Sequence, residues 1–197
     1  MKQKMPITSR IALGIAAFLM MITMFLPWWG LKFWAPQYPE GLDIIVYPTR
    51  LAGDIDIINS LNNYIGMAQF SEETFPEFIV FPYLIIAAVI AMIAVIILNR
   101  RIYYFVLLGL AAVASVIGLY RMWYWLSEFG TNLDPTAPIT VDPFVPPIIG
   151  PNTIANFETF SNFQIGGWII FIIIVLIAIA PFLKDKGRAQ KKRRDLK

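Results

Sequence analysis

Cysteine and histidine are both absent from the 197 residues of this chain. Their absence excludes disulfides, thiolate nucleophiles, Cys/His zinc sites, His-ligated haem and histidine proton relays. The motifs G-x-x-x-x-G-K-[ST], G-x-S-x-G and H-E-x-x-H are missing as well. Catalysis would have to depend on carboxylates, Tyr, Lys, Ser and Thr alone. We therefore expect a protein that is not an enzyme and that binds no cofactor.

Four long apolar stretches dominate what is present. A helix needs about 20 mainly apolar residues to cross the hydrocarbon of a bilayer. The sequence therefore predicts an all-α polytopic membrane protein, with four transmembrane helices and a small ordered extracytoplasmic cap built by two long loops. The first stretch ends without a small-x-small cleavage signature, which predicts an uncleaved anchor. The expected segments are the N-terminus 1–10, span 11–29, loop 30–77, span 78–98, turn 99–101, span 102–126, loop 127–165, span 166–183 and the basic tail 184–197.

Charged residues set the expected orientation, because Lys and Arg that flank spans are retained on the cytoplasmic side. Thirteen of the 16 basic residues lie before the first span, in the turn between the second and third, or after the fourth. Eleven of the 13 acidic residues lie in the two long loops. The pattern predicts a multi-pass plasma membrane protein whose termini are both cytoplasmic and whose long loops are extracytoplasmic. The tail is expected to attract anionic lipid headgroups rather than nucleic acid.

Both loops have patterns that indicate order. Residues 42–47 are rich in β-branched side chains and predict a short strand. An amphipathic helix is predicted to follow, with Asp54 as its N-cap and Gly66 as its stop. The second loop is rich in proline, which predicts an extended path rather than a helix. The tryptophans near the outer ends of the spans are interpreted as headgroup-belt residues rather than ligand platforms; they are Trp28, Trp29, Trp34, Trp123, Trp125 and Trp168.

Several runs of letters resemble a family of bacterial polytopic membrane proteins. Residues 34–42 read WAPQYPEGL and residues 58–67 read INSLNNYIGM, where the family carries APQYPEGL and IN-x-LNHYIGM. Residues 129–135 read FGTNLDP and residues 146–150 read PPIIG, where the family carries YGHNLDP and PPLIG. The resemblance covers about two thirds of the chain. It implies an association with copper-related respiratory gene clusters, including those for nitrous oxide reduction.

The chain departs from this family at the positions that would bind metal. The family places histidines where this chain has Asn63 and Thr131, and a methionine within the stretch that here spans 141–145. Two His and one Met would form a reasonable copper site. Met67 alone is too weak a ligand to replace them. The resemblance therefore implies a degenerate site at Asn63 and Thr131, on a scaffold that is retained but no longer binds metal.

Arg121 is the one charged residue predicted inside a span, and such a residue is a functional hypothesis by default. It is expected either to extend toward the outer surface or pair with Glu128, or else to anchor a loop or contact a partner. Tyr38, Tyr64 and Asp134 are further structural or partner-contact candidates.

Three classes of function follow from these observations. The first is a non-catalytic accessory or assembly subunit of a larger membrane-bound redox complex, copper-dependent or respiratory, with other integral membrane subunits and lipid as its partners. The second is a copper-handling protein that acts on the outer face. The third is a small transporter or channel component, which the absence of an inverted repeat and of broken helices argues against. We favour the first.

Overall fold

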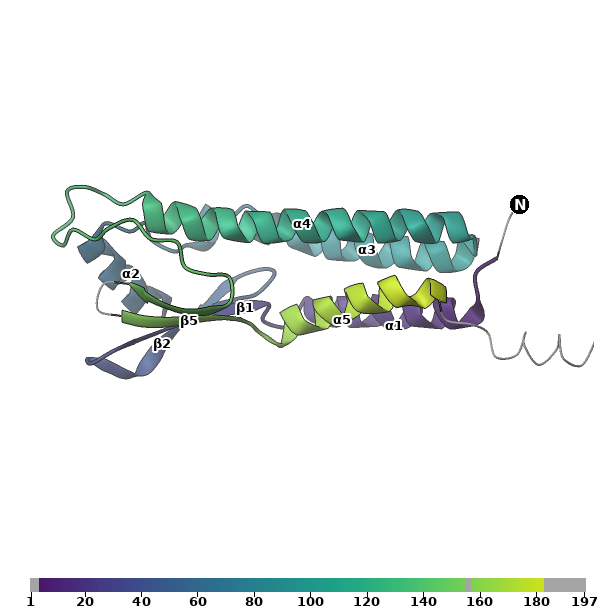
Figure 1. Ribbon diagram of the computed structural model, residues 1–197, viewed down its shortest axis with the longest axis horizontal. Coiled ribbons are helices and arrows are strands. Elements are labelled where there is room, and N and C mark those ends of the chain that lie inside the picture. The colour runs from purple at the N-terminus through teal and green to yellow at the C-terminus, as the bar shows by residue number, and fades with distance from the viewer. Residues whose placement is uncertain (1–3, 155–156, 183–197) are drawn as a thin grey trace, which may run out of the picture.

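The two long connections between the apolar helices pair with each other in one antiparallel sheet (Figure 1). The computed structural model describes residues 4–154 and 157–182. The first connection supplies β1 (Trp29–Ala35), β2 (Tyr38–Val46) and β3 (Leu51–Gly53), and the second supplies β4 (Gly150–Ile154) and β5 (Phe157–Phe163). The strand order is β3-β2-β1-β5-β4. The all-α prediction is therefore wrong, because this sheet together with the helices makes an α/β fold.

Side chains alternate across the sheet with the period of two that a strand imposes. In β1, Trp29, Leu31 and Phe33 are buried on the inner face, whereas Lys32 and Trp34 lie on the outer face and are partly exposed. The sequence contains this alternation, but it falls in the tryptophan-rich run that we interpreted as part of a headgroup belt. Trp29 is instead a core residue, and its indole N–H donates to the carbonyl of Ile148 at 2.8 Å.

Helix α2 (Ile55–Ile65) lies over the inner face of the sheet and occupies the predicted amphipathic segment. Its Ile58 is buried in the core of the sheet. Gly66 follows with φ 74°, the left-handed conformation that ends many helices and that suits glycine. Asp54 does not cap α2 with its side chain; its Oδ2 accepts from the backbone N–H of Asp43 at 2.9 Å and ties the start of the helix to β2. A short 3₁₀ turn, η1 (Glu72–Thr74), precedes the next helix.

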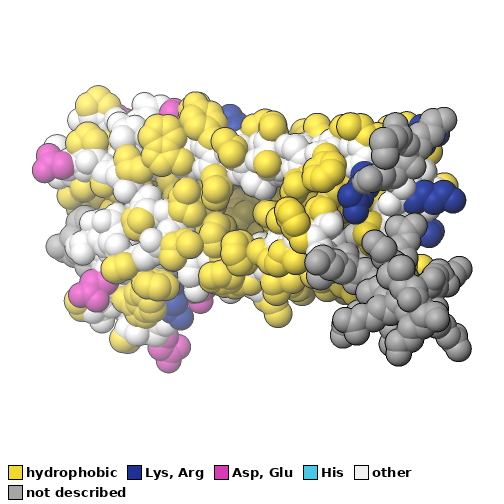
Figure 2. Space-filling model, turned by 45° about the vertical axis from the view of Figure 1, so that its right-hand side comes forward, with side chains coloured by type: hydrophobic (Ala, Val, Ile, Leu, Met, Phe, Trp, Pro, Cys, Tyr) yellow, Lys and Arg dark blue, Asp and Glu magenta, His cyan; other side chains and the backbone are white. Residues whose placement is uncertain are grey.

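Among the described residues there are four apolar helices, and they extend from one end of the sheet (Figure 1). Three are long and apolar enough to cross a membrane: α3 (Glu77–Leu98), α4 (Arg101–Thr131) and the continuous segment of α5 (Ile165–Ile179) and η2 (Ala180–Phe182). Helix α1 (Ile7–Thr23) is also apolar but has only 17 residues, because the end of the predicted first span turns into β1. The view in Figure 2 shows a hydrophobic band along the helices, with most of its acidic side chains at the sheet end and most of its basic ones at the other end. The predicted tail at 184–197 lies outside the described residues.

Two separate hydrophobic cores hold the molecule together. The inner core lies among the four helices far from the sheet and includes Leu13, Met92, Tyr104 and Ile173, one from each helix. The outer core lies between the sheet, α2 and the far end of α4. Helix α4 reaches both, because its 31 residues span about 46 Å at 1.5 Å per residue, more than the ~30 Å of bilayer hydrocarbon.

Candidate functional site

Arg121 of α4 pairs with Glu77, the first residue of α3. Its Nε donates to Glu77 Oε1 at 2.6 Å, and its Nη2 forms an ion pair with the same oxygen. Trp125, one turn further along α4, donates its indole N–H to that oxygen at 3.1 Å. Three N–H donors from α4 therefore converge on one carboxylate oxygen of α3. Arg121 pairs with Glu77 rather than with Glu128, which was one of the alternatives expected for it, and Glu128 accepts instead from the side-chain amide of Asn132 at 3.0 Å.

Aromatic rings surround this ion pair and restrict its access to water. The Arg121 guanidinium lies over the rings of Tyr124 and Trp125, 5.0 and 5.4 Å from their centroids, and such contacts strengthen when desolvated. Phe75 packs edge-on against Trp125 and stacks on Phe129. The Glu77 side chain retains 16% of its exposure and the Arg121 side chain 37%. The pair is thus half-buried where the helices meet the sheet region.

Glu77 is also placed favourably by its own helix. It occupies the first turn of α3, where unpaired backbone N–H groups make the helix end positive and stabilise a carboxylate. Its second oxygen, Oε2, is buried and has no hydrogen-bond partner among the described residues. All of the pairing therefore depends on Oε1. We call Glu77, Arg121 and Trp125 the brace, because they join α3 to α4 just below the sheet.

Backbone hydrogen bonds join the second long connection to the first and to the end of α4. The N–H of Asp134 donates to the carbonyl of Gly66 at 2.8 Å, and that of Ile139 donates to Tyr64 at 2.9 Å. The N–H of Phe144 donates to the carbonyl of Gly130 at 3.0 Å. These bonds bring together the segments that would carry the family's metal ligands. Such juxtaposition is a property of the backbone, and it does not require the ligands themselves.

The side chains at the predicted site positions have other partners. Asn63 is exposed and accepts from Gln69 at 3.4 Å, whereas Thr131 is exposed and donates to the carbonyl of Ser127 at 2.8 Å. Within residues 4–154 and 157–182, no three acidic side chains gather closely enough to hold a metal ion. Tyr38 is half-buried in β2 and packs against the outer core, and Tyr64 is exposed.

Asp134 is exposed and closes a turn. Its Oδ1 accepts from the backbone N–H of Thr136 at 2.8 Å and from the Thr136 hydroxyl at 2.7 Å. Both hydrogen bonds favour the charged carboxylate and lower the pKa of Asp134 below its usual value. The same residue holds Gly66 through its backbone, so Asp134 positions both loops.

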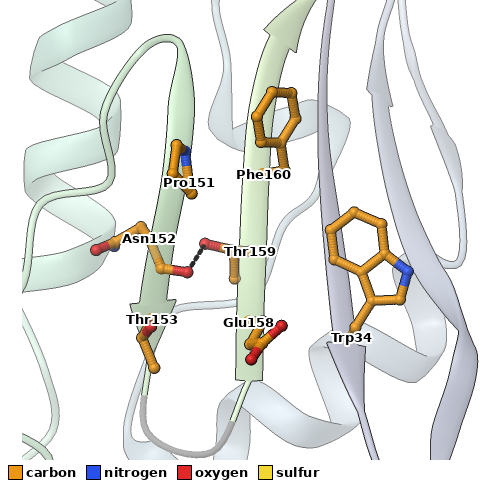
Figure 3. Close-up of a pocket in the computed structure, with 7 residues that line it drawn as sticks. All are labelled: Trp34, Pro151, Asn152, Thr153, Glu158, Thr159 and Phe160. Carbon is orange, nitrogen blue, oxygen red and sulfur yellow. Dashed lines mark hydrogen bonds between the residues drawn. The ribbon is translucent and has the colours of Figure 1, made fainter.

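The outer face of the sheet has a shallow hollow of about 550 Å³ (Figure 3). On this face Trp34 of β1 lies opposite Glu158 of β5, and Phe160, which retains 41% of its exposure, lies two residues further along β5. The ammonium group of Lys32 lies 5.6 Å from the Trp34 ring centroid and 3.6 Å from Asp43 Oδ2. We call Trp34, Glu158 and Phe160 the sheet patch; the residues that line the hollow are Trp34, Pro151, Asn152, Thr153, Glu158, Thr159 and Phe160.

Comparisons with known proteins give no family for this chain: no family model matches it, and no curated protein matches it either.

The sequence located Arg121 but not its partner. Glu77 is the last residue of the predicted first loop, and a carboxylate in a loop gives no indication in the sequence of a partner in a span. Glu77 begins α3 at the end nearer the sheet, and Arg121 lies toward the same end of the neighbouring helix α4. A search for opposite charges at corresponding ends of neighbouring predicted spans would have predicted the pairing of Glu77 with Arg121.

Proposed function

We propose that the chain is a plasma membrane protein with four spans, with both termini in the cytoplasm and the sheet outside. Three helices of sufficient length support this topology, as does the position of α1, which packs beside α3 and α5 in the inner core. Its 17 residues cover about 26 Å, and the turn at 24–28 supplies the rest of the ~30 Å. The excess of Lys and Arg at the helical end favours a cytoplasmic position for that end.

The function that fits this architecture best is that of an accessory or assembly subunit of a larger membrane complex. The observation that carries the proposal is the sheet patch. The inner face of the same strands is buried in the outer core, whereas the patch presents the exposed side chains of Glu158 and Phe160 and the partly exposed ring of Trp34. Exposed aromatic residues bordered by charged ones are typical of the centres of protein interfaces.

The brace makes the sheet patch a better docking surface. A docking surface binds more tightly when it is fixed before the partner arrives, because less conformational entropy is lost. The brace fixes α4 to α3, and α4 in turn packs Met122 and Leu126 against the outer core under the sheet. The resemblance to a family from copper-related respiratory gene clusters is the reason to propose a redox complex as the partner.

The proposal is tested by extracting the tagged chain from its native membrane in a mild detergent. Native electrophoresis and mass spectrometry then identify the proteins that co-migrate with it. Trp34→Ala combined with Phe160→Ala should abolish or strongly reduce co-migration. Trp123→Ala is the matched control, because Trp123 is an exposed aromatic residue of α4 that does not line the hollow. A wild-type chain that migrates alone would contradict the proposal, and a partner with no redox cofactor would contradict its respiratory part.

A further inference from the structure

Glu158 of β5 is the charged residue of the sheet patch, and no cation balances it within residues 4–154 and 157–182. Its side chain is exposed beside the hollow and takes part in no ion pair or hydrogen bond among these residues. Figure 3 shows its carboxylate on the same face of the sheet as the rings of Trp34 and Phe160. The patch therefore combines two aromatic rings with an unpaired negative charge.

Lys32 lies on the same face of the sheet but neutralises a different carboxylate. In β1 it is paired in register with Phe160 of β5 on one side and with Asp43 of β2 on the other. Its ammonium group lies 3.6 Å from Asp43 Oδ2 and is thus directed toward β2, whereas Glu158 is on β5. Because β2 and β5 flank β1 on opposite sides, Lys32 leaves the charge of Glu158 without compensation.

The basic residues toward the sheet end of the chain show how this protein binds a cation. Each of the three lies over one or two aromatic rings, 4.5–5.6 Å from the ring centroids: Lys32 over Trp34, Arg50 over Tyr47, and Arg121 over Tyr124 and Trp125. Two of them, Lys32 and Arg121, also pair with a carboxylate. Both kinds of contact strengthen when water is excluded. Phe160 and Glu158 offer the same two groups, a ring and a carboxylate, without a cation from the described residues.

A partner that covers the sheet patch changes the surroundings of Glu158. It removes water from the carboxylate, and a carboxylate that loses water without gaining a cation or N–H donors opposes binding. An apolar partner group is therefore disfavoured. A guanidinium suits the patch better, because its plane stacks on an aromatic ring while two of its N–H groups bind one carboxylate. An ammonium group has no such planar fork.

The cation has to come from a different protein. The two long connections contain 11 of the 13 acidic residues of the chain but only two basic ones, Lys32 and Arg50. Lys32 is already held by Asp43. The guanidinium of Arg50 already lies over Tyr47. A second copy of this chain would bring one acidic surface against another, so charge complementarity favours a partner whose contact surface is basic.

We propose that the sheet patch binds an arginine side chain of the partner subunit, which stacks on the ring of Trp34 or Phe160 and pairs with Glu158. The inference rests on the proposed function and adds the chemistry of the contact, since it requires a partner that is basic where it meets the sheet. Removing the charge of Glu158 should then weaken the contact although both rings remain.

The first test titrates the isolated full chain, in an uncharged detergent, with N-acetylarginine amide. N-acetylcitrulline amide is the control probe, because citrulline keeps the length and the planar end of arginine but has no charge. Tryptophan is replaced by 5-fluorotryptophan, and fluorine nuclear magnetic resonance follows the signal of Trp34, which is the one that Trp34→Phe removes. We expect arginine to shift this signal and citrulline to leave it unchanged.

Glu158→Gln should weaken the response to arginine about tenfold or more, because charge-assisted hydrogen bonds are roughly twice as strong as neutral ones. Glu73→Gln is the matched control and should respond as the wild type does. Glu73 is also an exposed glutamate, and it follows Glu72, which accepts from the N–H of Leu51 at the opposite edge of the sheet. An unchanged response of Glu158→Gln would overturn the proposal. Equal shifts with citrulline or with N-acetylleucine amide would indicate a neutral or apolar occupant and would also overturn it.

The same two variants test the contact in the extracted complex. Glu158→Gln should lose the co-migrating partner and Glu73→Gln should keep it. Retention by both variants would overturn this inference and leave the accessory-subunit function intact. A wild-type chain that migrates alone would contradict the proposed function instead, and the arginine titration would still decide the chemistry of the sheet patch.

Discussion

The sheet region and the helical bundle use apolar residues in opposite ways. In the sheet, Leu31, Phe33 and Ile44 retain 5%, 8% and 3% of their exposure. In α4, only 11% of the most apolar stretch is buried inside the protein. The membrane location proposed above accounts for the difference, because water would surround the sheet region and favour burial of its apolar side chains, whereas lipid would solvate those of the bundle as well as protein does. Exposure in this chain therefore measures the solvent as much as the packing.

The first way to test this contrast is to delete one large side chain from each region. Phe33→Ala should destabilise the protein by about 3–5 kcal/mol, since it leaves a cavity in the outer core. Leu110→Ala, at a position 61% exposed on α4, should cost close to nothing in bilayers. Thermal unfolding of both variants in lipid nanodiscs measures the difference. Similar losses for the two would show that the exposed face of α4 is covered by protein in the native membrane.

The brace joins the two regions, and its removal should have the next largest effect. Arg121→Ala leaves Glu77 half-buried without its cation, and breaking a buried pair costs about 3–5 kcal/mol. The partial exposure of Arg121 reduces our expectation to about 2–3 kcal/mol. Glu77→Ala combined with Arg121→Ala should recover part of the loss, because the unpaired charge is gone. A double-mutant cycle on thermal stability gives the coupling, and strictly additive losses would contradict the pairing.

A smaller effect is expected at the contact between α4 and the second connection. A Cβ at Gly130 would overlap the carbonyl of Phe144, so Gly130→Ala should destabilise by about 1–3 kcal/mol. Gly109→Ala is the control, because its Cβ meets nothing and gains about 1 kcal/mol of helix propensity. Opposite signs are therefore expected from the same substitution in one helix, and unfolding midpoints report them. A stabilising Gly130→Ala would mean that the second connection does not pack there.

Sequence patterns predicted the helices better than the sheet, for a physical reason. A transmembrane span is recognised from a continuous stretch of sequence. The span expected at 78–98 accordingly matches α3, which begins one residue earlier and ends at the same residue. A sheet depends on pairing between distant segments, and no local pattern couples Trp29 to Phe163 across 134 residues. The inner face of β5 also carries Thr159 and Ser161, both buried, so its hydrophobic alternation is weak. The same limit applies to the brace. Arg121 is recognised from the sequence because it is a charged residue within a predicted span, whereas the role of Glu77 is evident only from its contact with Arg121.

The smallest expected effect concerns pH and is confined to the water-facing region. The hydrogen bonds from Thr136 lower the pKa of Asp134, so its unfolded value, about 3.9, lies above its folded one. A lowered folded pKa contributes stability that is present above the unfolded pKa and is lost as the pH falls through the folded pKa. The turn should therefore hold at neutral pH and open only below about pH 4. The Thr136 amide shift in nuclear magnetic resonance follows this titration. Asp134→Asn, which keeps an acceptor oxygen but does not titrate, should flatten the curve. A wild-type midpoint at or above 3.9 would show that the carboxylate does not accept these bonds in solution.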